Sequence, residues 1–239
     1  MSFLNGSPTW MYNAGGDFYP YKINQSLRFN RADSAYLNRT SSSPTLGTKA
    51  TWSFWAKKTE VVDDTSSAYR MVFYAGTPNV DGFRIGFARY QGDPHRLHVS
   101  QDNGASSSHM FIQSEAAFRD TAGWYHFIIS YDSTNSTAAD RVKFYSNGEF
   151  VPIKSSPRTN PSLNHIPKYQ VSGATLKIGK GRDDDNEHID MYLAEINFID
   201  GQALDPTSFG QFTNGYWEAI DYAGTYGTNG FHLTFEDDV

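Results

Sequence analysis

Residues 124–132, WYHFIISYD, decide the fold class of this chain. Large apolar residues occupy every second position, so their side chains fall on one side of an extended backbone. The series is Tyr125, Phe127, Ile129 and Tyr131. An alternation of period two predicts a β-strand with one side against a core and the other facing outward.

Segments on both sides of this strand repeat the pattern. TWSFWAK (51–57) puts Trp52, Phe54 and Ala56 on one side, and FRIGFAR (83–89) does the same with its apolar residues. RVKFYSNGEFV (141–151) predicts two short strands around Asn147-Gly148, a pair that favours the tight type I′ hairpin. Three more strands are predicted in TLKIG, YLAEINFI and FHLTF.

No stretch of helical periodicity longer than two turns interrupts these strands. Strands separated by turns, without intervening helices, predict an all-β chain folded as a two-sheet antiparallel β-sandwich of the jelly-roll type. Only DPTSFGQF (205–212) suggests one short helical turn, with Asp205 as its cap and Pro206 at its first position.

Composition limits the classes of function. The chain has 239 residues, which suits one all-β domain with a sizeable core. Its formal net charge of -6 argues against nucleic-acid binding. It has no cysteine, which excludes disulfides and thiolate metal sites. The start shows no signal peptide, and no apolar run reaches the roughly 18 residues that membrane insertion requires.

The chain divides into two parts. Residues 1–24 form an N-terminal arm rich in Gly, Pro and aromatics, and residues 25–239 form the sandwich domain. Aromatic residues on such an arm suit docking onto a partner subunit, because they bury much area with few rotamers to freeze. Packing of the arm against its own domain is equally compatible. The aromatic residues concerned are Trp10, Tyr12, Phe18, Tyr19 and Tyr21.

The strand segments also carry a resemblance to a known family. From residue 26 to about residue 235, SLRFNRADSAYLNRT, ATWSFWAKKT, GWYHFIISYDS, RVKFYSNGEFV, TLKIGKGR and YLAEINFIDGQALDP occur in the order expected of laminin G-like domains. Those domains belong to the concanavalin A-like lectin/glucanase superfamily, alongside pentraxins. FIDGQALDP, FGQF and GTYGTNGFHLTF are similar to virion proteins of tailed bacteriophages, especially marine ones. The resemblance implies a jelly roll on a virus particle.

Carboxylates along YLAEINFID do not match the pattern of glucanases on this fold. Those enzymes place their acid and nucleophile on one face of one strand, as E-x-D-x-E or E-x-D-x-x-E. Here Asn197 replaces the middle acid, and Asp200 lies an odd number of residues from Glu195, on the opposite face. Glu195 and Asn197 are predicted to form the polar side of a strand whose Ala194, Ile196 and Phe198 face the core. We therefore expect no enzymatic activity.

An acidic turn is the best candidate metal site. GRDDDNEHID (181–190) gathers oxygen ligands of the kind that Ca²⁺ prefers. The resemblance adds that relatives often hold calcium at the sandwich rim. Asp183, Asp185 and Asn186 are the candidate ligands. The alternative is a solvated acidic turn that prevents edge-to-edge pairing of sheets.

Sugar binding requires flat aromatic rings beside hydrogen-bonding groups. Most aromatic residues fall on alternating apolar faces and are predicted to be core. Aromatic residues outside clean strands are better candidates, and packing against the end of the sandwich is their alternative use. The candidates are Tyr90, Tyr216, Trp217 and Tyr222.

Three hypotheses follow. The leading one is a non-enzymatic virion protein, located on the particle surface as a homo-oligomer, whose sandwich binds host-cell glycan or decorates the particle through other virion proteins. The second is a calcium-dependent carbohydrate-binding module without a virion role. The third, a glycan hydrolase, lacks its carboxylate pattern.

Overall fold

The computed structural model describes residues 21–61, 69–76, 81–90, 93–102, 108–181 and 187–236. Within these ranges the chain forms β-strands, four short 3-10 turns and no α-helix. The 3-10 turns are Arg31–Asp33, Ala138–Asp140, Lys168–Gln170 and Pro206–Ser208. None of the described residues belongs to a helix long and apolar enough to cross a membrane.

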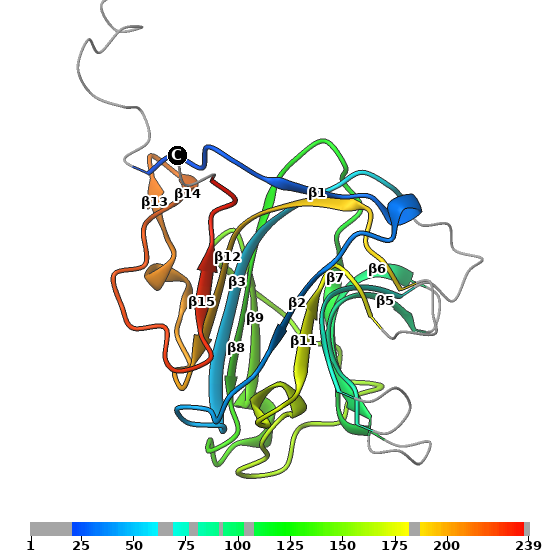
Figure 1. The fold of residues 1–239 in the computed structure, drawn as a ribbon, viewed down its shortest axis with the longest axis vertical. Helices are drawn as coiled ribbons and strands as arrows, with labels where there is room; N and C mark the ends of the chain where they lie inside the picture. Colours follow the sequence, from blue (N-terminus) through cyan, green and yellow to red (C-terminus); the bar gives the residue numbers. More distant parts are fainter. Residues whose placement is uncertain are drawn as a thin grey trace, which may run out of the picture.

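Two antiparallel sheets face each other (Figure 1). The first, called here the β3 sheet, contains in spatial order β1 (Leu27–Phe29), β12 (Met191–Asp200), β3 (Lys49–Lys58), β8 (Tyr125–Asp132), β9 (Val142–Ser146) and β10 (Glu149–Val151), with β15 (Phe231–Leu233) also paired to β12. The second, called the β5 sheet, contains β2 (Leu37–Thr40), β11 (Thr175–Ile178), β4 (Tyr69–Ala75), β5 (Phe83–Tyr90), β6 (Asp93–Asp102) and β7 (Ser108–Ala117). The predicted two-sheet sandwich is therefore confirmed.

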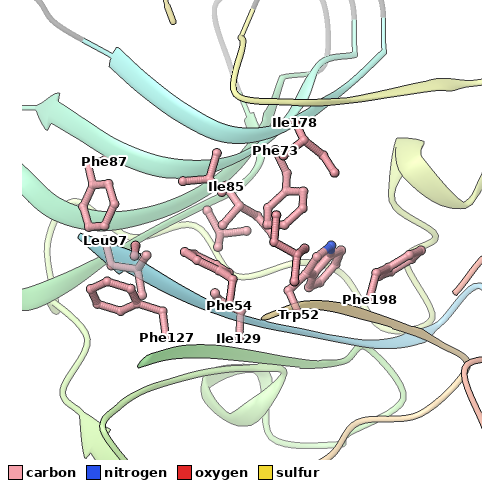
Figure 2. Close-up of a cluster of buried hydrophobic side chains, with 14 of the residues drawn as sticks. Trp52, Phe54, Phe73, Ile85, Phe87, Leu97, Phe127, Ile129, Ile178 and Phe198 are labelled. Atoms are coloured by element: carbon pink, nitrogen blue, oxygen red, sulfur yellow. The ribbon is translucent and has the colours of Figure 1, made fainter. Parts of the chain in front are cut away.

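The core fills the space between the sheets (Figure 2). Trp52 lies at its centre, stacked on Phe83 from the β5 sheet with ring centroids 5.4 Å apart. On its own sheet Trp52 stacks on Phe198, also at 5.4 Å, while Tyr169 meets it edge-on at 4.5 Å. The side chains that alternation assigned to the buried sides of β3, β5 and β8 lie in this core, except that Tyr125 is partly buried and packs against its edge.

Two turns also follow the prediction. Asn147 and Gly148 have φ angles of 49° and 81°, and Ser146 pairs with Glu149, which is the geometry of a two-residue type I′ hairpin. Asp205 caps the 3-10 turn that begins at Pro206, since its Oδ1 accepts the amide of Thr207 at 3.0 Å.

Strand β12 contains a β-bulge that alternation does not reveal. Ala194 pairs with Trp55 and Asn197 with Ser53, so three steps along β12 match two steps along β3. The extra residue is Glu195, whose φ is 47°. Ala194 is buried, but the expectation that it faces the core with Ile196 and Phe198 is wrong. The bulge turns Ala194 to the outer face of the β3 sheet.

The C-terminal segment covers part of that outer face. Strands β13 (Gly210–Thr213) and β14 (Tyr216–Ala219) form a small antiparallel hairpin, called here the C-terminal hairpin. A second apolar cluster lies between this segment and the sheet, and it is separate from the main core. Its members are Ile128, Ile199 and Phe209, with Tyr145, Leu204, Trp217, Tyr222 and Tyr226 packed against them.

Candidate functional site

A cavity of about 290 Å³ lies on the outer face of the β3 sheet. This volume is close to the lower limit for small-molecule sites, about 300 Å³, so the cavity suits a group the size of one ring. Two indoles, two amides and a hydroxyl are among its side chains. The lining residues are Ile23, Asn24, Gln25, Ser26, Trp55, Trp124 and Ala194.

Trp55 forms the floor of the cavity on the side of the sheet. It stands on the outer face because it is one position out of phase with the buried residues of β3. Its cross-strand neighbours are Ala194 on β12 and His126 on β8. The His126 ring is parallel to the indole, with centroids 4.7 Å apart and planes inclined by 2°. His126 therefore covers one indole face, and the small Ala194 leaves space beside the other.

Trp124, immediately before β8, supplies the second indole. Its relative exposure of 38% shows that solvent reaches the ring. It approaches Tyr192, with ring centroids 6.5 Å apart and planes inclined by 58°. The guanidinium of Arg28 lies 5.3 Å from the centre of the Tyr192 ring, a cation–π contact that fixes Tyr192 beside the cavity.

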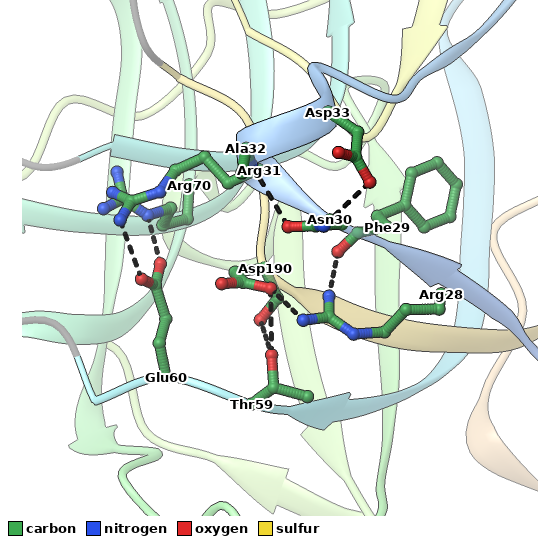
Figure 3. Close-up of polar contacts among 10 residues, drawn as sticks. All are labelled: Arg28, Phe29, Asn30, Arg31, Ala32, Asp33, Thr59, Glu60, Arg70 and Asp190. Carbon is green, nitrogen blue, oxygen red and sulfur yellow. Dashed lines mark hydrogen bonds and ion pairs between the residues drawn. The ribbon is translucent and has the colours of Figure 1, made fainter.

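Asp190 holds this rim together rather than serving as a free acid (Figure 3). Arg28 makes an ion pair with Asp190 Oδ1 and also donates to the carbonyl of Phe29. The hydroxyl of Thr59 lies 3.1 Å from the same carboxylate oxygen and 2.8 Å from the Asp190 carbonyl. Because its carboxylate is engaged on two sides, Asp190 ties β1 and the end of β3 to the start of β12.

Residues 21–26, called here the N-terminal strap, form the wall of the cavity opposite the sheet. The Tyr21 hydroxyl donates to Glu195 Oε2 at 2.8 Å, and Asn24 Nδ2 donates to Glu236 Oε1 at 2.9 Å. Burial, helped by the Glu195 carboxylate, raises the pKa of Tyr21 well above its usual range. The described end of the N-terminal arm therefore packs against the domain, and its other aromatics, Trp10, Tyr12, Phe18 and Tyr19, lie outside the described residues.

The two carboxylates of β12 itself, Glu195 and Asp200, are also engaged in structural contacts. Glu195 Oε2 contacts His232 Nε2 at 2.5 Å as well as Tyr21. Asp200, only 1% exposed, accepts the amides of Thr45 and Asn229 at 2.8 and 3.0 Å. Each carboxylate thus joins β12 to a neighbouring segment, and Asp190, Glu195 and Asp200 do not converge on the cavity.

His126 is a titratable side chain in contact with Trp55, the floor of the cavity. The indole N–H of Trp217 donates to His126 Nδ1 at 2.8 Å, and His126 Nε2 lies 2.7 Å from the Ser53 hydroxyl. Burial lowers the pKa of His126 from 6.5 to about 3. Burial likewise lowers the pKa of His98, in the β5 sheet, to about 3. Both rings are therefore neutral at physiological pH.

These two histidines predict a loss of stability in mild acid. The unfolded chain binds a proton at each histidine below about pH 6.5, whereas the folded protein does not until about pH 3. The contribution of these two neutral rings to the free energy of unfolding is therefore complete above pH 6.5 and declines as the pH falls toward 3. At pH 5 it has fallen by about 2 kcal/mol for each histidine.

Urea unfolding at pH 7 and pH 5 measures this effect. In His126→Phe, the difference in unfolding free energy between the two pH values should be smaller than in wild type by about 2 kcal/mol. An unchanged difference would mean that the folded protein protonates His126 as readily as the unfolded chain does.

The four aromatics proposed for sugar binding do not gather in one place. Tyr90 ends β5, and its side chain is outside the described part of the chain. Trp217 and Tyr222 pack on the outer face of the β3 sheet, and Tyr222 stacks on Phe209 with centroids 5.1 Å apart. Tyr216, 75% exposed, projects from the C-terminal hairpin. Their role in sugar binding stays a prediction, and Tyr216, Trp217 and Tyr222 do not line the cavity.

The proposed calcium ligands Asp183, Asp185 and Asn186 lie outside the described residues, so the calcium site also stays a prediction. Among the residues that the structure describes, no three His, Asp or Glu side chains are arranged to hold a metal ion.

Sequence reasoning missed both tryptophans of the cavity. The signal for Trp55 was present in TWSFWAK, where a large aromatic residue occupies the phase opposite to Trp52 and Phe54. A tryptophan on the outer side of a strand presents a large apolar ring that a covering segment or a ligand can bury. Trp124 gave a similar signal, because it precedes the alternating run and has no place in its buried series.

Comparisons with known proteins agree with the architecture. The sequence profile of the Concanavalin A-like lectin/glucanases superfamily matches residues 30–208. A heptameric SAP-like pentraxin from Limulus polyphemus is 17% identical, with a TM-score of 0.50 over 77% of this chain and 79% of that one. At that identity the likeness shows the fold alone. No curated protein sequence matches the chain.

Two further solved structures are similar at lower scores. Domain 4 of AbnA, a GH43 extracellular arabinanase from Geobacillus stearothermophilus solved with arabinotriose, is 12% identical, with a TM-score of 0.46 over 77% of this chain and 84% of that one. Tailspike protein 2 of the Escherichia coli O157:H7 bacteriophage CAB120 is 11% identical, with a TM-score of 0.46 over 80% of this chain and 24% of that one.

Proposed function

Because the chain belongs to the concanavalin A-like lectin/glucanase superfamily, we propose that it is a non-catalytic carbohydrate-binding protein whose sugar site is the cavity lined by Trp55 and Trp124. The observation that carries this proposal is the presence of two indoles beside side-chain amides in one cavity of about 290 Å³. Indole faces pack against the apolar C–H faces of a sugar ring, and amides both donate to and accept from hydroxyl groups.

The lining also favours one class of sugar. None of its side chains is ionised at neutral pH, and Asn24, Gln25 and Ser26 supply neutral donors and acceptors. An acidic sugar would bring a carboxylate into a site without a cation to pair with it, at a desolvation cost. The cavity is therefore suited to a single neutral sugar ring, such as the terminal residue of a glycan.

We propose a non-catalytic role because the carboxylates around the cavity are already engaged. Glycoside hydrolysis requires two carboxyl groups on opposite sides of the scissile bond, one acting as acid. Asp190 is paired with Arg28, and Glu195 accepts from Tyr21 and His232. Glu236 accepts from Asn24 Nδ2 at 2.9 Å. None of these three carboxylates lines the cavity.

We further propose that the protein serves on the particle of a tailed bacteriophage, where it binds host glycan or decorates the surface. Support comes from the segments FIDGQALDP, FGQF and GTYGTNGFHLTF, which resemble such virion proteins. A pocket for one ring binds weakly by itself, and a homo-oligomer on a particle would compensate through avidity.

A glycan array tests the sugar proposal directly. The purified full chain, labelled and applied with Ca²⁺ or with EDTA, should bind saturably to glycans that end in a neutral sugar and poorly to those that end in an acidic one. Loss of binding in EDTA would show that a divalent cation takes part in binding, with Asp183, Asp185 and Asn186 as the candidate calcium ligands to replace next. Absence of binding to every glycan would contradict the proposed function, and β-glucan turnover that disappears in Glu195→Gln would contradict its non-catalytic character.

A further inference from the structure

The ring of His126 has a single tautomer consistent with its contacts. An indole N–H can only donate, so His126 Nδ1, 2.8 Å from Trp217 Nε1, must accept and carries no proton. The proton of the neutral ring therefore lies on Nε2, which donates to the Ser53 hydroxyl at 2.7 Å. With 1% exposure and both nitrogens occupied, the imidazole has no contact left for solvent or ligand.

The imidazole is also held between two indoles. It is parallel to Trp55 at a centroid distance of 4.7 Å and lies 6.0 Å from Trp217, with planes inclined by 29°. Its backbone is fixed as well. His126 N donates to Asn147 Oδ1 and Asn147 N donates to the His126 carbonyl, both at 2.8 Å. His126 therefore cannot turn without losing contacts on three sides.

Trp217 is held just as closely, by the C-terminal hairpin on one side and by the Asn147-Gly148 turn on the other. A Cβ atom at Gly148 or at Gly210 would lie 2.3 Å from the Trp217 ring, so both positions require glycine for the indole to fit. Phe212 meets the indole edge-on, with centroids 5.0 Å apart. The hairpin and the turn thus fix the position of the N–H that selects the His126 tautomer.

We propose that His126 is a positioning residue for the sugar site, which orients Trp55 under the control of Trp217 and so couples the C-terminal hairpin to the cavity. The inference rests on the proposed function, since Trp55 supplies the indole face on which the sugar packs. Neither His126 nor Trp217 lines the cavity, so any effect of these residues on affinity is transmitted through Trp55.

A double-mutant cycle tests the coupling. His126→Phe retains a flat ring against Trp55 but removes both hydrogen bonds, and Trp217→Phe removes the donor alone. Each variant should weaken binding of the best neutral glycan by about tenfold, because the same buried hydrogen bond is lost. The double variant should bind no more than about tenfold more weakly than wild type, since interacting residues are not additive.

Gln211→Ala is the matched control on the hairpin. Gln211 is exposed and bonded to Glu218 at 2.8 Å, and alternation along the hairpin puts it on the face opposite to Phe212 and Trp217, so the affinity should be unchanged. The coupling would be overturned if the affinity losses of the two single variants multiplied in the double variant. It would also be overturned if His126→Phe kept full affinity for the glycan. A loss in Gln211→Ala equal to that in Trp217→Phe would also overturn it, because the hairpin would then act as a whole and not through the indole.

Nitrogen NMR of the histidine ring provides a readout independent of sugar. The wild-type protein should show His126 protonated at Nε2 and unprotonated at Nδ1, and Trp217→Phe should change that pattern together with the indole N–H resonance of Trp55. A wild-type ring protonated at Nδ1 would overturn the proposal. If wild type binds no glycan at all, the proposed function fails, whereas unchanged affinity in His126→Phe beside a binding wild type refutes only the positioning role.

Discussion

Trp124→Ala should lower the affinity for a neutral glycan by about thirtyfold while leaving the fold intact. A tryptophan at the centre of a binding site typically contributes about 2 kcal/mol or more when truncated, which corresponds to this factor. The side chain is 38% exposed and does not belong to the main core. Its removal should therefore change the free energy of unfolding by no more than about 0.5 kcal/mol.

Isothermal titration with the best glycan from the array, together with urea unfolding of each variant, measures both quantities. Phe150→Ala is the control, because Phe150 is an exposed aromatic residue on β10 that does not line the cavity. It should bind as wild type does. If Trp124→Ala retains full affinity while the protein still binds sugar, the site lies elsewhere, and Tyr90, Tyr216, Trp217 and Tyr222 become the residues to replace.

The second large effect concerns stability. Trp52→Ala should destabilise the fold by about 3–5 kcal/mol, because it removes a fully buried ring that packs against Phe83, Tyr169 and Phe198 and leaves a cavity between the sheets. That is a large fraction of the roughly 5–15 kcal/mol by which most proteins are stable. The melting temperature should fall by about 10 °C.

Calorimetry on Trp52→Ala beside Trp124→Ala separates the two roles of one residue type. Both variants lose an indole, so a difference between their melting temperatures reports burial in the core alone. Equal small shifts in the two variants would mean that the sheets close over the space left by Trp52, and the central position given to that ring would be wrong.

The strands could be predicted because burial on one side imposes a period of two on the sequence. TWSFWAK, FRIGFAR and WYHFIISYD became β3, β5 and β8 with their expected sides in the core. Asn147-Gly148 formed its hairpin because the positive φ angles of that turn restrict which residues can occupy it.

The cavity could not be predicted in the same way, because it depends on contacts between distant segments. Trp55 and Trp124 meet the N-terminal strap only after the sheet has formed, and no local pattern records that Tyr21 reaches Glu195. The alternation in β3 showed that Trp55 faces outward. It did not show that the N-terminal strap lies across from the ring and encloses a cavity. Trp217 is a second example: it packs on the sheet and bonds to His126, two contacts with distant segments that no local pattern predicted.

The bulge at Glu195 changes how related chains should be aligned and searched. Ala194 and Asn197, three residues apart, are successive neighbours on one face, whereas residues two apart across the bulge lie on different faces. A relative without the inserted residue has β12 shorter by one position, and a gap must be opened at 195 for its later residues to match. Two carboxylates on the same face, one on each side of the bulge, would be three residues apart in the sequence. A motif search that allows only even spacings would miss such a pair.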